Sequence, residues 1–445
     1  MCSGWTPAPE PTWNVSETAS YSPDTGPHRV DSQATSAALG SISDADLESY
    51  ANLIVKVGLH LRSEQDLLIE AEPEHASLVR AVAEAAYRSG AHHVSVLYRD
   101  PHLIRAHIEH GPVGSLGWCP PWMLEQIRYL AQGQGAYVRI AGDPQPGLMD
   151  DLDGNLVGGA VLRERLALVY QEILVKRSIS WVIAPWPTGG WASKVLDQAN
   201  PAMLWEDIRL ALRLDEQDPS AAWTGRVEEL ERRATELTRL AFNWLHFQGP
   251  GTDLKVGLIP GGRWSTAMRP TSWGQPNLVN IPTEEVFTSP DWRLVDGTVR
   301  ATRPLALHST IVEGLEVRFS GGRAVEVRAR SGADVVLTEM STDEQASYLG
   351  EVSLVDGDSR VARLGRVYYE TILDENASCH VAYGSGFDEA LPEPVDGAEQ
   401  LQARGVNQST VHRDFMIGGP EVEVDGVYDS GRRVEILRSN RWCLD

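Results

Sequence analysis

The residues best suited to catalysis lie in the last third of the chain, where histidines and carboxylates recur. They are Glu284, Glu285, Glu351, His380, His412 and Asp414. His412 and Asp414 are separated by one residue, so in an extended segment both side chains point the same way and can reach one ion. The two imidazoles with three of these carboxylates suit a pair of divalent cations bridged by water or hydroxide. Because these positions are far apart in the sequence, spacing alone also allows ordinary surface or capping roles.

A second interpretation of the same residues is a mononuclear iron centre. His380, His412 and Asp414 alone form a set of two histidines and one carboxylate, which is the ligand set of non-haem iron(II) oxygenases. Such a centre has no need of Glu285 and Glu351, so these two glutamates favour the two-cation hypothesis.

Five of the twelve histidines lie between His92 and His110. His107 and His110 share a predicted helix face and could hold a metal. No carboxylate cluster accompanies them, so a solvated helix surface is the favoured interpretation. The chain has no phosphate-binding loop, no complete dinucleotide fingerprint, no zincin motif and no nucleophile elbow.

Composition limits the partners and the compartment. The chain has 445 residues, with 39 Lys+Arg against 62 Asp+Glu and a formal charge of −23, which argues against nucleic acid and anionic lipid as partners. No apolar run approaches the ~18 residues of a membrane span. The N-terminus has no secretion signal, and the four cysteines are far apart, so we expect a cytoplasmic protein.

Three segments of the chain differ in composition and in the secondary structure that their patterns predict. Residues 1–40 are rich in Pro, Ser, Thr and Gly, which predicts a disordered arm. Residues 41–215 alternate between strand and helix patterns, with a helix beginning after Ser43, strands over 66–71, 93–98, 137–140 and 180–184, and a helix over 74–89. This pattern predicts a doubly wound parallel-sheet α/β domain.

Residues 216–445 are predicted to form a strand-rich α+β domain that binds the metals. A long amphipathic helix through Val227 and Leu237 leads into it. Alternating segments around residues 320–322 and 429–431 predict two hairpins. Ser341-Thr342-Asp343-Glu344 has the pattern of a capping box and predicts a short helix that ends near Gly350.

Several longer strings in this sequence resemble motifs of the thermophilic metallo-aminopeptidase family (the aminopeptidase T and aminopeptidase S type). The resemblance runs from about residue 44 to about residue 440. The strings are Gly251-Thr252-Asp253-Leu254, residues 281–290 (IPTEEVFTSP), Leu349-Gly350-Glu351-Val352, residues 374–380 (DENASCH) and residues 412–418 (HRDFMIG).

The resemblance implies a two-domain chain, usually a homodimer, with two divalent ions (zinc, cobalt or manganese) in the C-terminal domain. Carried over residue by residue, it implies that the metal ligands are Glu285, Glu351, His380, His412 and Asp414. Glu284 and Glu285 are exchangeable on this basis, and whichever is not a ligand is a candidate general base.

One position departs from the family pattern. The family has a tyrosine seven residues after the first histidine, where it is proposed to bind metal or stabilise the transition state. Here the residue is Phe387, which has no oxygen. Tyr383, three residues after His380, is the candidate to take over that catalytic role, and its alternative role is packing.

The resulting expectation is a metal-dependent aminopeptidase that hydrolyses N-terminal residues from peptides with a free N-terminus, using a water activated by two metals. The alternatives are a diverged member that acts as a non-haem iron(II) ring-cleaving dioxygenase, to which the C-terminal domain is also similar, and a catalytically silent binding protein.

Overall fold

The computed structural model of the chain describes residues 42–161, 173, 176–395 and 397–444. These residues belong to one compact unit, Leu39–Asp445. The arm predicted for residues 1–40 lies outside the described residues. Within the described part of the chain, no helix is both long and apolar enough to cross a membrane.

The first half contains a four-stranded parallel sheet, as the alternating pattern predicts. The strand order is β2-β1-β3-β4, and every neighbouring pair is parallel. The strands are β1 Asp66–Ala71, β2 His93–Tyr98, β3 Ala136–Ala141 and β4 Ser180–Pro185. β1 and β2 match the predicted strands residue for residue.

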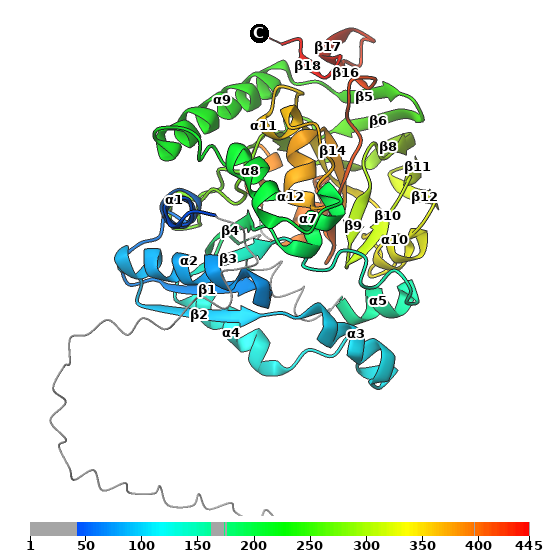
Figure 1. Ribbon diagram of the computed structural model, residues 1–445. Coiled ribbons are helices and arrows are strands. Elements are labelled where there is room, and N and C mark those ends of the chain that lie inside the picture. Colours follow the sequence, from blue (N-terminus) through cyan, green and yellow to red (C-terminus); the bar gives the residue numbers. More distant parts are fainter. Residues whose placement is uncertain (1–41, 162–172, 174–175, 396, 445) are drawn as a thin grey trace, which may run out of the picture. The chain divides into compact units, whose positions relative to one another are not determined.

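Helices cover both faces of this sheet, with α2 on one side and α4 on the other (Figure 1). Along β1, Leu67 and Ile69 pack into one apolar cluster and Leu68 into another, because successive strand residues point to opposite faces. The fold class predicted for this half is therefore confirmed. Its helices are α1 Asp44–Leu53, α2 Ala76–Arg88, α3 Pro101–His110, α4 Pro121–Gln132, α5 Gly154–Val161, α7 Gly189–Leu196 and α8 Pro201–Ala211.

Helix α9 (Pro219–Leu240) leads into the strand-rich half. Its buried residues include Val227 and Leu237, as the predicted amphipathic helix requires. An eight-stranded antiparallel sheet follows in the order β12-β11-β8-β6-β5-β16-β17-β18. The strands are β5 Trp244–Gly249, β6 Thr252–Leu258, β8 Pro290–Arg300, β11 Glu316–Ser320, β12 Arg323–Arg328, β16 Glu423–Val427, β17 Arg433–Arg438 and β18 Arg441–Trp442.

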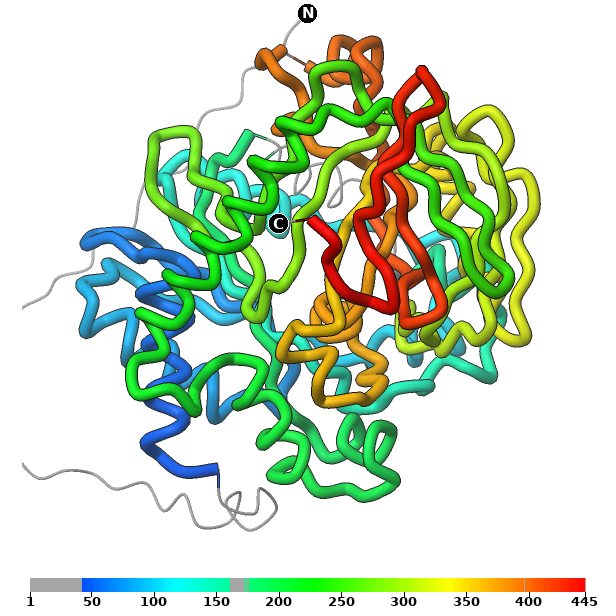
Figure 2. The backbone as a smooth tube through the Cα atoms, turned by 90° about the horizontal axis from the view of Figure 1, so that it is seen from above, coloured from blue at the N-terminus to red at the C-terminus, as the bar shows by residue number. Residues whose placement is uncertain are grey.

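Both predicted hairpins, β11–β12 and β16–β17, are present in this sheet. The C-terminal hairpin, red in Figure 2, lies beside the green strands β5 and β6 because β16 pairs with β5. The last strands of the chain therefore belong to the same sheet as β5 and β6, the first strands of the strand-rich half.

A smaller antiparallel sheet, in the order β15-β14-β13-β7, carries the candidate site. Its strands are β7 Val286–Thr288, β13 Leu349–Leu354, β14 His380–Gly384 and β15 His412–Met416. A separate two-stranded sheet pairs β9 (Leu305–Leu307) with β10 (Thr310–Val312).

Shorter helical segments connect these strands. They are η2 Ile54–Gly58, η3 Pro73–His75, η4 Val113–Ser115, α10 Ala333–Glu339, α11 Arg360–Arg363, α12 Thr371–Asp374, η5 Glu375–Ala377, η6 Asp388–Ala390 and α13 Ala398–Ala403.

The prediction of a short helix after Ser341 is wrong, because residues 341–347 form turns and bends. The Asp343 carboxylate accepts hydrogen bonds from Ser409 and Thr410, which are distant in the sequence. The Ser341 hydroxyl donates back to the carbonyl oxygen of Leu337 in α10. The tertiary contacts of Asp343 and the bond of Ser341 to the preceding helix therefore override the local helix signal.

The core of the parallel-sheet half also draws on residues beyond the predicted domain boundary at 215. Ile281, Val361 and Leu373 belong to the same apolar cluster as Leu67 of β1. This shared cluster packs part of the strand-rich half against the parallel sheet, and the boundary at residue 215 stays a prediction.

Candidate metal centre

The five predicted metal ligands converge on one face of the small sheet. His380 opens β14, His412 and Asp414 lie on β15, and Glu351 lies on β13. In the strand register, Ala382 of β14 lies opposite Glu351 on one side and opposite Asp414 on the other. Directly opposed residues of antiparallel strands share a face. The two carboxylates therefore stand on the same face, with only a methyl group between them.

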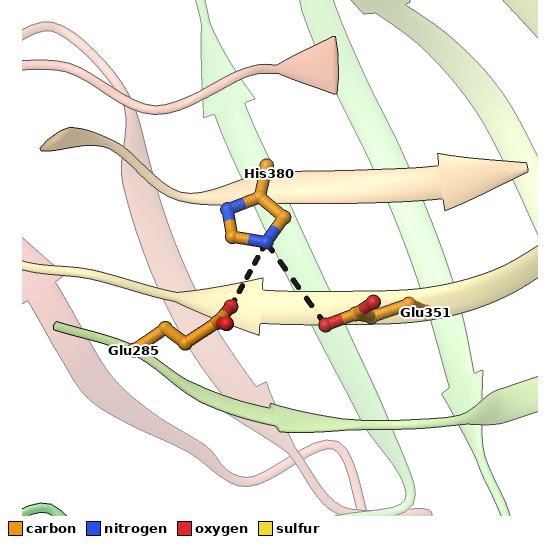
Figure 3. Close-up of side chains that lie close together, drawn as sticks. All are labelled: Glu285, Glu351 and His380. Carbon is orange, nitrogen blue, oxygen red and sulfur yellow. Dashed lines mark ion pairs between the residues drawn. The ribbon is translucent and has the colours of Figure 1, made fainter. Parts of the chain in front are cut away.

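The ligand atoms form two groups that share Glu351. Nε2 of His380 lies 3.0 Å from Oε2 of Glu285 and 4.0 Å from Oε1 of Glu351 (Figure 3). Nε2 of His412 lies 3.1 Å from Oε2 of Glu351 and 3.6 Å from Oδ1 of Asp414. Within each group of three residues the ligand atoms all lie within 4.8 Å of one another. Each oxygen of Glu351 thus faces a different histidine.

Backbone carbonyls hold both imidazoles in place. Nδ1 of His380 lies 3.1 Å from the carbonyl oxygen of Glu375, and Nδ1 of His412 lies 2.8 Å from that of Ser385. A carbonyl oxygen only accepts hydrogen bonds, so each Nδ1 must donate, and each Nε2 faces the carboxylates. Metal-binding histidines are held in this way by their second nitrogen.

The cluster is buried and acidic. Glu351 is 4% exposed and Glu285 5%, and Oδ1 of Asp414 is buried with no hydrogen-bond partner within the described residues. Burial raises the pKa of Glu351 to about 7; the charges of Asp414 and Glu285 also raise it, and His412 opposes the shift. Buried carboxylates need a compensating positive charge. Carboxylate oxygens and imidazole nitrogens are a suitable donor set for divalent zinc, cobalt or manganese.

The pKa values of the two histidines agree with this requirement for positive charge. Burial lowers the pKa of His380, but Glu285, Asp414 and Glu351 raise it by more, so the net shift is well upward. The pKa of His412 is raised in the same way, mainly by Asp414, against the lowering effect of burial. The site therefore attracts positive charge, either as protons on the imidazoles or as metal ions.

Phe387 lies beside this cluster, at the position of the family tyrosine. Its ring centroid is 5.1 Å from that of His412 and 5.0 Å from that of Phe287. The guanidinium carbon of Arg269 lies 4.7 Å from the same ring centroid. The departure from the family pattern thus places an apolar ring directly against a predicted metal ligand.

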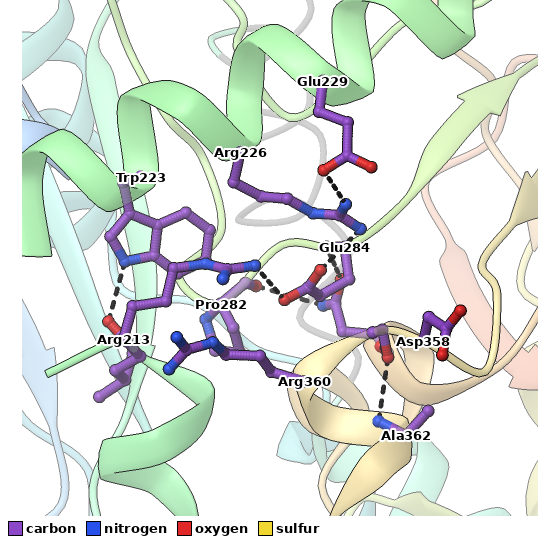
Figure 4. A network of polar contacts seen from close by, with 12 residues as sticks. Arg213, Trp223, Arg226, Glu229, Pro282, Glu284, Asp358, Arg360 and Ala362 are labelled. Carbon is purple, nitrogen blue, oxygen red and sulfur yellow. Dashed lines mark hydrogen bonds and ion pairs between the residues drawn. The ribbon is translucent and has the colours of Figure 1, made fainter. Parts of the chain in front are cut away.

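Glu284 is not brought into the cluster. It is 1% exposed, and its two carboxylate oxygens pair with Nη2 of Arg213 at 2.8 Å and Nη2 of Arg226 at 2.7 Å (Figure 4). Its backbone N–H donates to the side chain of Asn376 at 2.6 Å. These contacts anchor the segment that carries Glu285, and they leave the Glu284 carboxylate neutralised by two guanidinium groups.

Tyr383 is not brought into the cluster either. It lies three residues after His380 on the same strand, so its side chain points to the opposite face of the sheet. There its hydroxyl donates a hydrogen bond to the buried carboxylate of Glu339. Tyr383 therefore cannot contact the predicted ligands directly in this arrangement.

Glu375 is the acidic group near the cluster that the sequence analysis missed. It is 6% exposed and accepts a hydrogen bond from Nδ2 of Asn280 at 3.2 Å. Its pKa is raised well above the ordinary value by burial first, and then by the charges of Asp414 and Glu285. It stands in the DENASCH string, five residues before His380, and that proximity was the available signal.

The histidines between His92 and His110 form no group of potential metal ligands within the described residues. His107 lies 2.8 Å from the Ser115 hydroxyl, and His92 pairs with Asp66. Both of these histidines therefore make ordinary polar contacts.

Comparison with known proteins shows similarity over most of the chain. A family model described as thermophilic metalloprotease (M29) matches residues 43–442. Aminopeptidase T of Thermus thermophilus is 39% identical over 406 residues, which cover 90% of this chain and 98% of that protein. Aminopeptidase AmpS of Bacillus subtilis is 32% identical over 408 residues, covering 89% and 98%. The solved structure of wild-type AmpT from Thermus thermophilus matches with a TM-score of 0.79 at 38% identity, covering 90% of this chain and 99% of that one.

Proposed function

The chain belongs to the thermophilic metalloprotease (M29) family, and on that premise we propose that it is an aminopeptidase that uses two divalent cations. The resemblance predicted from the sequence motifs is thereby confirmed, and as a metallo-aminopeptidase the protein is a hydrolase. The proposed ligands are Glu285, Glu351, His380, His412 and Asp414. The proposed substrate is a peptide with a free N-terminus.

The shared position of Glu351 carries this proposal. Its two oxygens face two different histidines, 4.0 Å from His380 and 3.1 Å from His412, which suits a carboxylate that bridges two ions. A mononuclear iron centre would leave Glu285 and Glu351 buried without a cation. Two bound cations would polarise the scissile carbonyl and lower the pKa of a water molecule.

We assign the role of proton acceptor to Glu375 rather than to Glu284. A general base works best when its pKa lies near the working pH. Burial, Asp414 and Glu285 raise the pKa of Glu375 above the ordinary carboxyl value, which is the direction that a general base needs. Glu284 is paired with Arg213 and Arg226, whose guanidinium groups occupy both of its carboxylate oxygens. The backbone carbonyl of Glu375 also holds His380, so this residue both orients a ligand and offers a carboxylate.

Two substitutions separate these assignments. We expect Glu375→Gln to lower kcat by roughly 10²–10⁴ while two metals per chain are retained. Glu284→Gln should lower the melting temperature, because Arg213 and Arg226, both mostly shielded from solvent, lose the carboxylate that pairs with both of them. It should leave kcat of the folded enzyme within a few-fold. The reverse pattern of rate loss would restore Glu284 as the base.

The metals and substrates need a direct test. Purified protein should be stripped with a chelator, reloaded with Zn²⁺, Co²⁺ or Mn²⁺, and assayed on a panel of aminoacyl reporter substrates with metal content measured in parallel. We expect about two ions per chain and amino-terminal hydrolysis that depends on them. One iron per chain without hydrolysis would support the dioxygenase alternative, and no metal would support the silent binding protein.

We also propose a homodimer that associates through the outer face of α4 and the edge strand β2. Trp118, Trp122 and Tyr129 are 65%, 62% and 64% exposed, and the last two share a face of α4 because they are seven residues apart. At roughly 200 Å² for each aromatic side chain, these three exposed rings offer about half of the ~800 Å² that one partner gives a stable interface.

Charge supports a second copy as the occupant of this face. Residues 87–129 hold four arginines and three acidic residues, whereas the whole chain carries −23, so two copies meet here with little repulsion. Light scattering should give about twice the chain mass of 48.9 kDa. Trp122→Glu should halve that mass, and Leu294→Glu, at an exposed position on β8, should not. A monomeric wild type would contradict the proposal.

A cytoplasmic location is also proposed. Within the described part of the chain Cys119, Cys379 and Cys443 are free thiols, which supports a reducing compartment.

A further inference from the structure

A second polar cluster lies on the face of the small sheet opposite the candidate metal centre. At its centre is Glu339, the last residue of α10, which is 1% exposed. Its carboxylate accepts hydrogen bonds from Nη2 of Arg413 at 2.9 Å, from Nε2 of His308 at 3.1 Å and from the hydroxyl of Tyr383. We call these four residues the Glu339 cluster.

The strand register explains why this cluster forms directly behind the predicted ligands. Arg413 stands between His412 and Asp414 on β15, so its side chain points to the other face. Tyr383 lies directly opposite Arg413 on β14, the strand that begins with His380. One buried carboxylate therefore binds both strands that carry the proposed histidine ligands.

His308 connects the cluster to the parallel-sheet half of the molecule. It lies in the turn between β9 and β10, where His308 and the following Ser309 both have positive φ angles, 52° and 57°. Such angles are unfavourable for residues other than glycine, asparagine and aspartate. The turn is held from both sides, by Glu339 through His308 and by Asp143 through the Ser309 hydroxyl at 2.6 Å.

The charge of Glu339 matters as much as its contacts. Burial raises its pKa, but Arg413 and His308 lower it by more, so it remains ionised. Its negative charge compensates the guanidinium of Arg413, which pairs with it at 2.9 Å and belongs to the residue between His412 and Asp414 on β15. Without Glu339, the partly buried guanidinium of Arg413 would lose this partner and would leave a positive charge behind a site that must attract cations.

We propose that Glu339 is a positioning residue for the metal centre. Acting through Arg413 and Tyr383, it fixes the orientation of His412 and Asp414 relative to His380, and it neutralises the guanidinium beneath them. This inference rests on the proposed two-cation function, because it assigns Glu339 a role in metal affinity rather than in folding alone.

Zinc titration of the metal-free protein tests the proposal. Substitution of groups that orient metal ligands typically weakens metal binding 10–100-fold, and we expect Glu339→Gln to weaken at least one of the two zinc-binding steps to that degree. Glu339→Asp, which keeps the charge, should recover part of the affinity.

Asp425→Asn is the matched control. Asp425 is 8% exposed and pairs with Arg438 and Arg433 in the large sheet, so it is also a buried carboxylate paired with arginine. It should lower the melting temperature and leave zinc affinity unchanged. If Glu339→Gln loses stability as Asp425→Asn does, yet binds both zinc ions with wild-type affinity, the proposal is overturned.

Two further outcomes are informative. If Glu339→Gln does not fold, Arg413→Lys replaces it. Lysine keeps the charge but cannot reproduce the contact that Nε and Nη2 of Arg413 make with the two oxygens of Glu339. Weakened zinc binding by a folded Arg413→Lys variant supports the proposal, and unchanged binding overturns it. A wild-type protein that takes up no zinc, cobalt or manganese would instead refute the proposed function, on which this inference depends.

Discussion

The phenyl ring of Phe387 packs against the imidazole of His412, with 5.1 Å between the two ring centroids. His412 in turn faces the shared carboxylate of Glu351 at 3.1 Å. The ring at position 387 is therefore one contact away from the proposed cations. A hydroxyl group on that ring would be an additional hydrogen-bond donor beside the site, and the natural sequence lacks it.

Phe387→Tyr is expected to raise peptidase turnover. A preorganised donor to a developing oxyanion is typically worth about 3–4 kcal/mol, which corresponds to roughly 10²–10³-fold in kcat. The measurement is kcat on one aminoacyl reporter substrate at saturating metal.

Phe387→Leu controls for a change in packing alone. It removes the ring and its contact with Arg269 without adding an oxygen, so it should lower stability, by about 0.5–2 kcal/mol if the cation–π contact dominates, and should not raise kcat. If Phe387→Tyr leaves kcat unchanged in an active enzyme, the absent hydroxyl has no catalytic importance here.

Glu351→Gln removes one negative charge from the carboxylate that belongs to both ligand groups, at nearly constant shape. We expect the loss of at least one bound ion and of most of the hydrolytic rate, measured by elemental analysis and by the reporter assay. The metal content of Glu284→Gln, whose carboxylate lies outside the cluster, should stay near the wild-type value. Normal metal content in Glu351→Gln would show that this residue is not a ligand.

Much of the fold could be predicted because its signals are local. The strands β1 and β2 and the hairpins follow from periodicity and turn residues, and the shared direction of His412 and Asp414 follows from strand alternation. The same alternation places Tyr383, three residues after His380, on the opposite face once β14 is recognised as a strand.

The remaining parts of the site depend on distant contacts. Of the adjacent Glu284 and Glu285, it is Glu284 that pairs with Arg213 and Arg226 from elsewhere in the chain, and no local pattern contains that information. Glu375 approaches the cluster through the short helical turn η5, for which strand periodicity gives no prediction. The turn at Ser341–Thr342 likewise reflects contacts of Asp343 with a segment more than sixty residues away.

Metal affinity should rise with pH. Without metal, burial, Asp414 and Glu285 raise the pKa of Glu351 to about 7, and the pKa values of His380 and His412 are also raised. A group with a raised pKa in the folded protein keeps its proton up to that pKa, and ligands must lose protons to bind a metal. Zinc affinity, measured by competition with a chelating dye, should therefore increase between pH 6 and pH 8, and a flat profile would contradict the ligand assignment.

The space between Glu351 and Asp414 can be tested through the residue that separates them. Ala382 lies opposite both in the strand register, and a small side chain there leaves room for cations between the two carboxylates. Ala382→Leu would place three more carbon atoms on that face. We expect at least tenfold weaker zinc binding, together with an overpacking cost of about 1–3 kcal/mol in the free energy of unfolding.

Val381→Leu separates these two effects. Val381 is the preceding residue of β14, fully buried on the opposite face, so an added carbon there should lower stability without reducing zinc affinity. Zinc titration and thermal unfolding should be measured on both variants. If Ala382→Leu binds two zinc ions per chain with wild-type affinity, the cations do not occupy the space between these carboxylates.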